Sequence, residues 1–315
     1  MRREWSVAVA LVVLAVVLAV SAPSYFSAEN ARDMFLVNMP ILVTAIGATL
    51  VILSGEIDIS IGSAFAVCSV AAGVAAKAHV PVAIAGAVAC AVGAAIGATN
   101  GVLVAYAGIP SIVVTLASMI VLRDGLRWVT QGAWVEDLPP AFQWLGVSQQ
   151  AFPFVVGVGV CLLVAAVAWT MWNVAAGRAV YATGSNVEAA RLGGINTALV
   201  KVWVFTIAGV FTGASALLNS VRFNQIPSNT GLGLEMKVIA AVVVGGAAIT
   251  GGRGTFTGTV LGVVLLGAIG PALTFLGVSA QWERALQGAI ILTAVAFDAT
   301  RARAMRPARA VFGSA

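Results

Sequence analysis

The feature of this sequence that most restricts its fold is a succession of long apolar runs that contain almost no charge. Of the 315 residues, 60% are hydrophobic and only 9% are charged. An average soluble domain carries about 25% charged residues, so this composition could not cover a water-exposed surface. Hydrocarbon offers the backbone no hydrogen bonds, which favours helices because they pair their own backbone groups. The sequence therefore predicts an all-α, polytopic membrane protein.

The apolar runs divide into about ten segments that could each cross a bilayer as a helix, since roughly 20 residues span its hydrocarbon core. The expected spans are residues 5–21, 35–54, 61–76, 82–106, 109–128, 152–173, 201–220, 235–249, 256–275 and 284–298. The third and the eighth are short for a full crossing. The first run resembles a secretory signal peptide, but Pro23 would follow the apparent cleavage site, so we expect an uncleaved helix.

The distribution of Lys and Arg predicts how the chain lies in the inner membrane. With the N-terminus inside, an even number of spans returns the C-terminus to the cytoplasm, and the inner segments then hold most of the basic residues. We expect one transmembrane domain over residues 1–300 and a basic cytoplasmic tail over 301–315 near anionic lipid. The net charge of +5 suits this orientation. No basic patch is interleaved with aromatic residues, so no nucleic acid partner is expected.

Few residues of the chain suit catalysis or metal binding. Cys68, Cys90 and Cys161 each lie alone within an apolar run, and His79 is the only histidine. Isolated cysteines of this kind are typical of small buried hydrophobic residues, and a single histidine cannot form a zinc site. A membrane-embedded enzyme is therefore disfavoured, and no catalytic or metal-binding residue is expected. An ion-driven transporter would need more intramembrane charge than these spans offer.

A polar segment in the second half of the chain, residues 175–200, contains a short helical sequence. Residues 188–192 favour a helix that Gly193 and Gly194 can end, because glycine readily adopts the left-handed conformation at a helix C-terminus. An exposed, charged helix on the inner face suits docking of a soluble motor domain, although an ordinary surface helix is the alternative. The residues expected to dock are Glu188, Ala189, Ala190, Arg191 and Gly194.

Two glycine-containing segments interrupt the apolar runs at similar places. Residues 54–63 and 250–259 each begin with a hydroxylated residue and glycine and end with glycine and a hydroxylated residue. Transporters are often built from repeats whose broken helices flank the path, although chance would produce the same echo. Glu56 and Asp58 lie in the first segment. They either line a path at membrane depth, where a carboxylate needs a partner or water, or are solvated in an inner loop.

Four separated motifs carry a resemblance to a known family. They are Ser54–Ser63, Tyr181–Arg191, Gly233–Gly246 and Gly251–Thr255. Their order and spacing resemble those of ribose-type sugar permeases of binding-protein-dependent ABC importers, and the resemblance covers nearly the whole chain. Glu188-Ala189-Ala190 with Gly194 resembles the EAA loop of such permeases, although the usual downstream Leu-Pro is missing. Three further segments look most similar to autoinducer-2 and rhamnose permeases: Gln131–Trp134, Leu138–Pro140 and Pro227–Gly231.

The resemblance implies an ABC importer permease fold and several partners. They are an ATP-binding cassette ATPase subunit, a periplasmic or lipid-anchored substrate-binding protein, and a second permease chain that is identical or related. The chain has no G-x-x-x-x-G-K-[ST] phosphate-binding sequence. We therefore expect no ATPase activity and no cofactor in this chain, with ATP and magnesium bound by the partner ATPase.

The expected substrate is a small neutral sugar or sugar-like molecule of the ribose, rhamnose or autoinducer-2 type. The spans contain almost none of the cations that an anionic substrate would require. Hydroxyl groups stripped of water need hydrogen-bond partners along the path. The expected partners are Glu56, Asp58 and Asn100 within the membrane, with Asn224, Gln225 and Asn229 near the outer mouth. A branched-chain amino acid permease remains the alternative.

Overall fold

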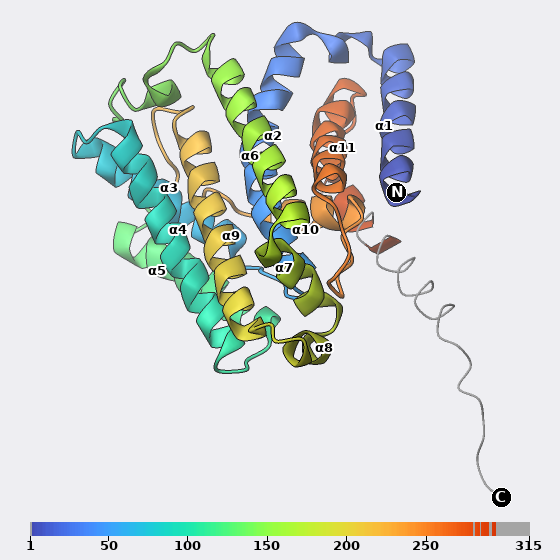
Figure 1. Cartoon of the computed structure of the whole chain (residues 1–315). Helices are drawn as coiled ribbons and strands as arrows, with labels where there is room; N and C mark the ends of the chain where they lie inside the picture. The colour runs from blue at the N-terminus through green and yellow to red at the C-terminus, as the bar shows by residue number, and fades with distance from the viewer. Residues whose placement is uncertain (1, 280, 284, 290–291, 294–315) are drawn as a thin grey trace, which may run out of the picture.

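The structure, a computed structural model, describes residues 2–279, 281–283, 285–289 and 292–293 (Figure 1). The helices are α1 (Arg2–Ser21), η1 (Pro23–Phe26), α2 (Ala28–Leu53), α3 (Ile61–Lys77), α4 (Val82–Ala105), α5 (Ser111–Thr130), η2 (Gln143–Gly146), α6 (Phe152–Asn173), α7 (Ala175–Ser185), α8 (Val187–Leu192), α9 (Thr197–Ser220), α10 (Leu234–Val244) and α11 (Phe256–Phe275). Between these helices, the described residues form only an isolated antiparallel bridge, which joins Val135 to Ile226. The expectation of an all-α membrane protein is confirmed.

The expected number of about ten spans is not confirmed, because only 6 of the described helices are long and apolar enough to cross a membrane. They are α1, α2, α4, α6, α9 and α11. Helix α3 has 17 residues and α10 has only 11. Helix α5 has 20 residues, but Arg123, Asp124 and Arg127 lower its apolarity.

The expected span 235–249 is interrupted by glycine. Helix α10 ends at Val244, and Gly246 follows with a φ of +100°, a conformation that would strain other residues. The chain therefore turns where a full crossing was expected. The expected span 284–298 lies mostly outside the described residues, and the basic tail over 301–315 lies wholly outside them.

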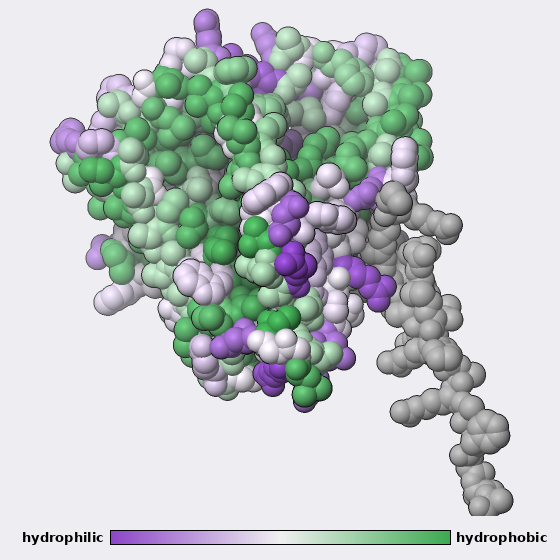
Figure 2. Space-filling model, viewed as in Figure 1, coloured by the Kyte–Doolittle hydropathy of each residue, from purple (hydrophilic) through white to green (hydrophobic). Residues whose placement is uncertain are grey.

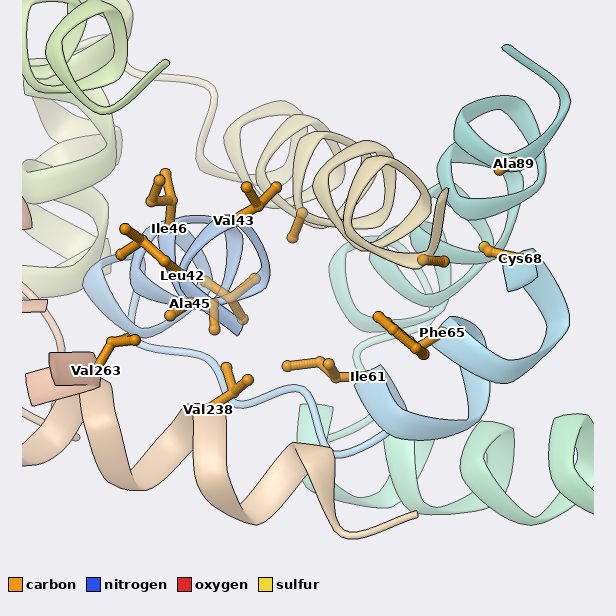
Figure 3. Close-up of a cluster of buried hydrophobic side chains, with 14 of the residues drawn as sticks. Leu42, Val43, Ala45, Ile46, Ile61, Phe65, Cys68, Ala89, Val238 and Val263 are labelled. Atoms are coloured by element: carbon orange, nitrogen blue, oxygen red, sulfur yellow. The ribbon is translucent and has the colours of Figure 1, made fainter. Parts of the chain in front are cut away.

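Helix α2 forms the centre of the bundle. The most apolar window of α2 is 83% buried, whereas that of α1 is 11% buried and that of α6 is 17% buried. Figure 3 shows Leu42 and Ile46 of α2 among side chains of neighbouring helices, including Phe65 of α3, Val238 of α10 and Val263 of α11. The cysteine expectation holds for Cys68, which is buried, but Cys161 is exposed.

Helices α4 and α9 pack through glycines that bring their backbones into direct contact. A side-chain carbon at Gly97 of α4 would overlap the carbonyl oxygen of Phe205 in α9. A side-chain carbon at Gly213 of α9 would lie 2.7 Å from the carbonyl carbon of Ala89 in α4. Small residues allow such close approach in membrane helices, where dispersion contacts replace the hydrophobic effect.

Helix α1 lies at the edge of the bundle beside α11 (Figure 1). Its contact with α11 includes the Glu4 carboxylate, which accepts hydrogen bonds from the hydroxyls of Thr255 and Thr257. The rest of α1 is largely uncovered, with Val12 62% exposed. Lipid is a suitable neighbour for such an apolar face.

The two ends of the bundle are built differently. Helices α7 and α8 form the lower end in Figure 1, and the loop over residues 131–151 lies at the upper end. Figure 2 shows hydrophilic residues gathered at the lower end around α8 and hydrophobic residues along the flank formed by α1. This pattern fits a membrane protein with polar ends and an apolar belt.

Candidate functional site

The first helix break connects α2 to α3 through residues 54–60. The chain turns at Gly55, whose φ is +86°, a conformation that glycine adopts without steric cost. The hydroxyl of Ser54 donates to the carbonyl of Val51 at 2.7 Å and closes the last turn of α2. The following residues have no regular secondary structure until α3 begins at Ile61.

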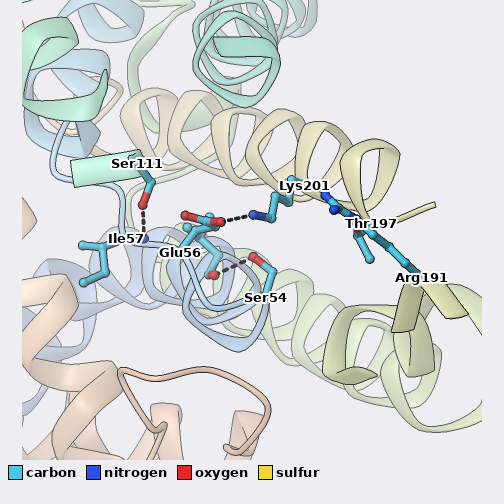
Figure 4. Close-up of polar contacts among 8 residues, drawn as sticks. Ser54, Glu56, Ile57, Ser111, Arg191, Thr197 and Lys201 are labelled. Atoms are coloured by element: carbon cyan, nitrogen blue, oxygen red, sulfur yellow. Dashed lines mark hydrogen bonds and ion pairs between the residues drawn. The ribbon is translucent and has the colours of Figure 1, made fainter. Parts of the chain in front are cut away.

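Glu56 in this break is held by a partner from α9. Its carboxylate forms an ion pair with Lys201, as Figure 4 shows, and their side chains are only 12% and 18% exposed, respectively. The next residue, Ile57, donates its backbone N–H to the hydroxyl of Ser111 at the start of α5, at 3.2 Å. Polar contacts therefore join this break to both α9 and α5.

Asp58 and Asn100 are linked through serines that the sequence analysis did not single out. Asp58 Oδ1 accepts hydrogen bonds from the backbone N–H and the hydroxyl of Ser60 at 2.8 and 2.6 Å. Asn100 of α4 donates to the same Ser60 hydroxyl at 3.0 Å, and Ser118 of α5 donates to Asn100 Oδ1 at 2.6 Å. Asp58 is 9% exposed and Asn100 only 1%.

Glu56 and Asp58 are both largely shielded from solvent, since the Glu56 side chain is 12% exposed and Asp58 is 9% exposed. Each also has a polar partner within the protein. Their contribution to a transport path stays a prediction. Ser118 gave no signal in the sequence, because an isolated serine in an apolar run has no spacing that points to a partner, whereas Ser60 lies within the 54–63 motif.

The second break, residues 245–255 between α10 and α11, lies directly against the first. Gly252 donates its backbone N–H to the carbonyl of Leu53 at 2.9 Å. A side-chain carbon at Gly251 would lie 2.7 Å from Gly55 Cα. The hydroxyls of Thr49 and Thr259 share a buried hydrogen bond of 2.8 Å. The two segments whose patterns echo one another in sequence are therefore neighbours in space, while their origin as repeats stays a prediction.

Helix α8 contains four of the five residues expected to dock, and Gly194 follows its end. Asn186 begins α8, and its side chain accepts the backbone N–H of Ala189 at 3.0 Å. Helix α8 ends at Leu192, and Gly194 follows with a φ of +82°, as the glycine pair predicts. Of the docking residues, Glu188, Ala189, Arg191 and Gly194 are exposed and Ala190 is buried.

Helix α7 precedes α8, which carries most of the residues expected to dock, and contacts both breaks. A side-chain carbon at Gly184 would overlap the carbonyl oxygen of Leu53 and lie 2.8 Å from the backbone nitrogen of Gly252. The Tyr181 hydroxyl donates to the carbonyl of Gly254 at 2.9 Å. Burial raises the pKa of the Tyr181 phenol, which therefore stays protonated and able to donate.

The three path residues expected at the outer mouth, Asn224, Gln225 and Asn229, are exposed. They lie in the segment between α9 and α10, which pairs with the 131–151 loop. Leu138 donates its backbone N–H to the carbonyl of Asn224 at 3.2 Å, and Val135 donates to that of Ile226 at 3.0 Å. This segment is at the opposite end from α7 and α8, so the structure does not bring these residues together with Glu56, Asp58 and Asn100.

A cavity of about 590 Å³ opens between the first half of α2, the start of α10 and the residues Glu283, Gln287 and Gly288. Its lining includes Val37, Phe65, Asn219, Thr230, Lys237 and Glu283, and none of the expected path residues. Arg123 of α5 donates to the carbonyl of Thr230 at 3.1 Å and holds the edge of the cavity. Lys237, a cation next to the apolar run 238–244, was the available sequence signal for this site.

Comparison with known proteins agrees with this architecture. The family described as "Branched-chain amino acid transport system / permease component" matches residues 30–295. The autoinducer 2 import system permease protein LsrC of Yersinia pseudotuberculosis serotype O:1b is 36% identical over 296 residues, which cover 94% of this chain and 84% of the relative. The protein of the same name from Yersinia pestis (strain Pestoides F) is 35% identical with the same coverage. No solved structure matches. The chain therefore belongs to the branched-chain amino acid transport system / permease component family and is a permease subunit of an ABC importer.

Proposed function

We propose that this permease moves a small neutral, hydroxylated molecule of the autoinducer-2, rhamnose or ribose type into the cell. The near full-length similarity to autoinducer 2 import permeases supports this substrate class. The observation that carries the transport mechanism is the contact of α7 with both helix breaks at Gly184. A movement imposed on α7 and α8 would reach both breaks without an intervening element.

The surface of α7 and α8 is where the partner ATPase would dock. Leu192 is 86% exposed at the end of α8. An exposed leucine next to Glu188 and Arg191 would suit a groove with an apolar centre and a polar rim. That partner would bind ATP and magnesium, and α7 and α8 of this chain would transmit its movement to the two helix breaks.

The remaining partners follow from the same assignment. A periplasmic or lipid-anchored binding protein would deliver substrate to the end formed by the 131–151 loop and the Asn224–Asn229 segment. A second permease chain, identical or related, would complete the translocation unit within the inner membrane. Both termini would face the cytoplasm, on the side of α7 and α8.

Uptake by vesicles that contain the complete importer tests this proposal. The permease is reconstituted with its ATPase, and the cognate binding protein is added outside with radiolabelled autoinducer-2, rhamnose or ribose. We expect ATP-dependent uptake of at least one of these compounds that unlabelled leucine, isoleucine and valine do not inhibit. Uptake of branched-chain amino acids, unaffected by sugars, would overturn the assignment.

A further inference from the structure

Lys237 and Glu283 form an ion pair in the wall of the cavity. Lys237 Nζ lies 2.6 Å from Glu283 Oε1, and the Gln287 amide donates to the same oxygen at 2.9 Å. The side chains of Lys237 and Glu283 are 33% and 20% exposed, and both line the cavity together with Gln287. A molecule inside the cavity would therefore meet these three side chains.

The position of Glu283 depends on a glycine in α11. A side-chain carbon at Gly270 would lie 2.7 Å from Glu283 Oε2, so the carboxylate occupies space that any larger residue would fill. The opposite wall of the cavity is apolar and includes Val37, Ile41 and Phe65. The cavity thus presents the polar side chains of Lys237, Glu283 and Gln287 together with an apolar wall that includes residues of α2, α3 and α10.

A charged pair in the membrane domain needs a reason beyond stability. Apolar residues of similar volume commonly stabilise a protein as well as a buried ion pair does. Ionisable residues among membrane helices usually mark a substrate or ion pathway. The volume of about 590 Å³ falls within the usual range for small-molecule sites, about 300–1,000 Å³.

We propose that the Lys237–Glu283 pair, with Gln287, forms hydrogen bonds with the transported molecule and selects a neutral solute that carries neighbouring hydroxyl groups. The Lys237 ammonium group can only donate hydrogen bonds, and the Glu283 carboxylate can only accept them. A hydroxyl can do both, so one of two adjacent hydroxyls accepts from Lys237 while the other donates to Glu283. The pair carries no net charge, and the apolar wall receives the C–H face of the solute. This inference rests on the proposed function and adds to it the residues that contact the transported molecule.

Uptake by the reconstituted importer is the first test, with Lys237→Met and Glu283→Gln compared against Arg127→Met. Arg127 is a suitable control because it pairs with Asp124 at 3.5 Å on an exposed surface and is not among the residues that line the cavity. We expect maximal uptake to fall at least about ten-fold in the two cavity variants, as for loss of a charged hydrogen-bond partner. The control variant should take up substrate as fast as the wild type. In the two cavity variants, the concentration of binding protein that gives half-maximal uptake should equal that of the wild type. Wild-type uptake in both cavity variants would overturn the inference.

A double variant separates substrate contact from structural support. Lys237→Met with Glu283→Leu replaces the pair by apolar side chains, which should restore thermal stability. Substrate contact predicts that uptake stays low in this stable protein, whereas recovery of uptake together with stability would refute it.

Thiol labelling provides an independent measurement. Lys237→Cys, made with Cys68, Cys90 and Cys161 changed to alanine, should react with a membrane-impermeant thiol reagent, and substrate-loaded binding protein should slow the reaction. An equal labelling rate with loaded and empty binding protein would refute the contact. If the wild-type importer moves none of the three neutral compounds, the proposed function fails. If it moves one of them while the variants behave as wild type, only this inference fails.

Discussion

Replacing Gly184 with alanine tests whether the contact between α7 and the two breaks matters for transport. The added methyl group would overlap the carbonyl oxygen of Leu53 and lie 2.8 Å from the nitrogen of Gly252. Those two groups share the 2.9 Å hydrogen bond that joins the breaks. Helix α7 must therefore move away, or the hydrogen bond must open.

The size of the effect follows from three contributions. Overpacking a tight site costs about 1–3 kcal/mol, and a lost hydrogen bond adds about 0.5–1.5 kcal/mol. Alanine within a helix regains about 0.8–1.0 kcal/mol over glycine. The free energy of unfolding should fall by about 0.5–4 kcal/mol. Because α7 would be displaced from both breaks, more ATP should also be hydrolysed for each molecule transported.

Gly125→Ala is the matched control, because Gly125 also lies within a helix and no atom lies within 4 Å of an added side-chain carbon. Thermal unfolding of the purified permease measures stability, and the ratio of ATP hydrolysed to substrate imported measures coupling. The control should be as stable as the wild type or more so, and fully coupled. If Gly184→Ala matches Gly125→Ala in both measurements, the contact does not transmit movement and the reasoning is wrong.

Three further predictions concern orientation and the first break. A reporter that is active only in the periplasm should stay silent when fused after Ala315, and activity there would contradict cytoplasmic termini. Glu56→Gln should lower the free energy of unfolding by about 3–5 kcal/mol, since Lys201 is left as a largely buried charge without its partner. Adding Lys201→Met should recover part of that loss in a thermal unfolding assay. No recovery would argue against the pair. Asn100→Ala should lower the free energy of unfolding by about 1–3 kcal/mol, because the Ser60 hydroxyl loses a hydrogen-bond donor. The control Thr99→Ala removes only an exposed hydroxyl bonded to its own helix and should have little effect. Equal losses in the two variants would contradict the buried network.

The helical membrane fold and the position of α8 could be predicted from the sequence, because both depend on local patterns. Apolar runs predict helices wherever they occur, and Gly193 with Gly194 ends α8 where expected. The number of spans could not be predicted in the same way. A run of apolar residues does not reveal that the chain turns within the membrane domain, as it does at Gly246.

The candidate site was only partly predictable, because its contacts join residues that are far apart in the chain. Glu56 and Asp58 stood out as carboxylates in an apolar context. Lys201, the partner of Glu56, lies about 145 positions further along the chain, and nothing in the sequence links the two. Lys237 and Glu283 likewise come together only once α10 and residues 281–289 are placed. No spacing rule links such pairs.

The attachment of α1 to α11 has a consequence for the order in which the protein assembles. The hydrogen bond between Glu4 and Thr255 joins residues 251 positions apart. At about 5–20 residues per second, the ribosome makes α11 roughly 10–50 s after α1. During that interval α1 must persist in the bilayer as a solitary helix, shielded by lipid tails. Its apolar composition, with a mean hydropathy of 2.3, suits that exposure to lipid.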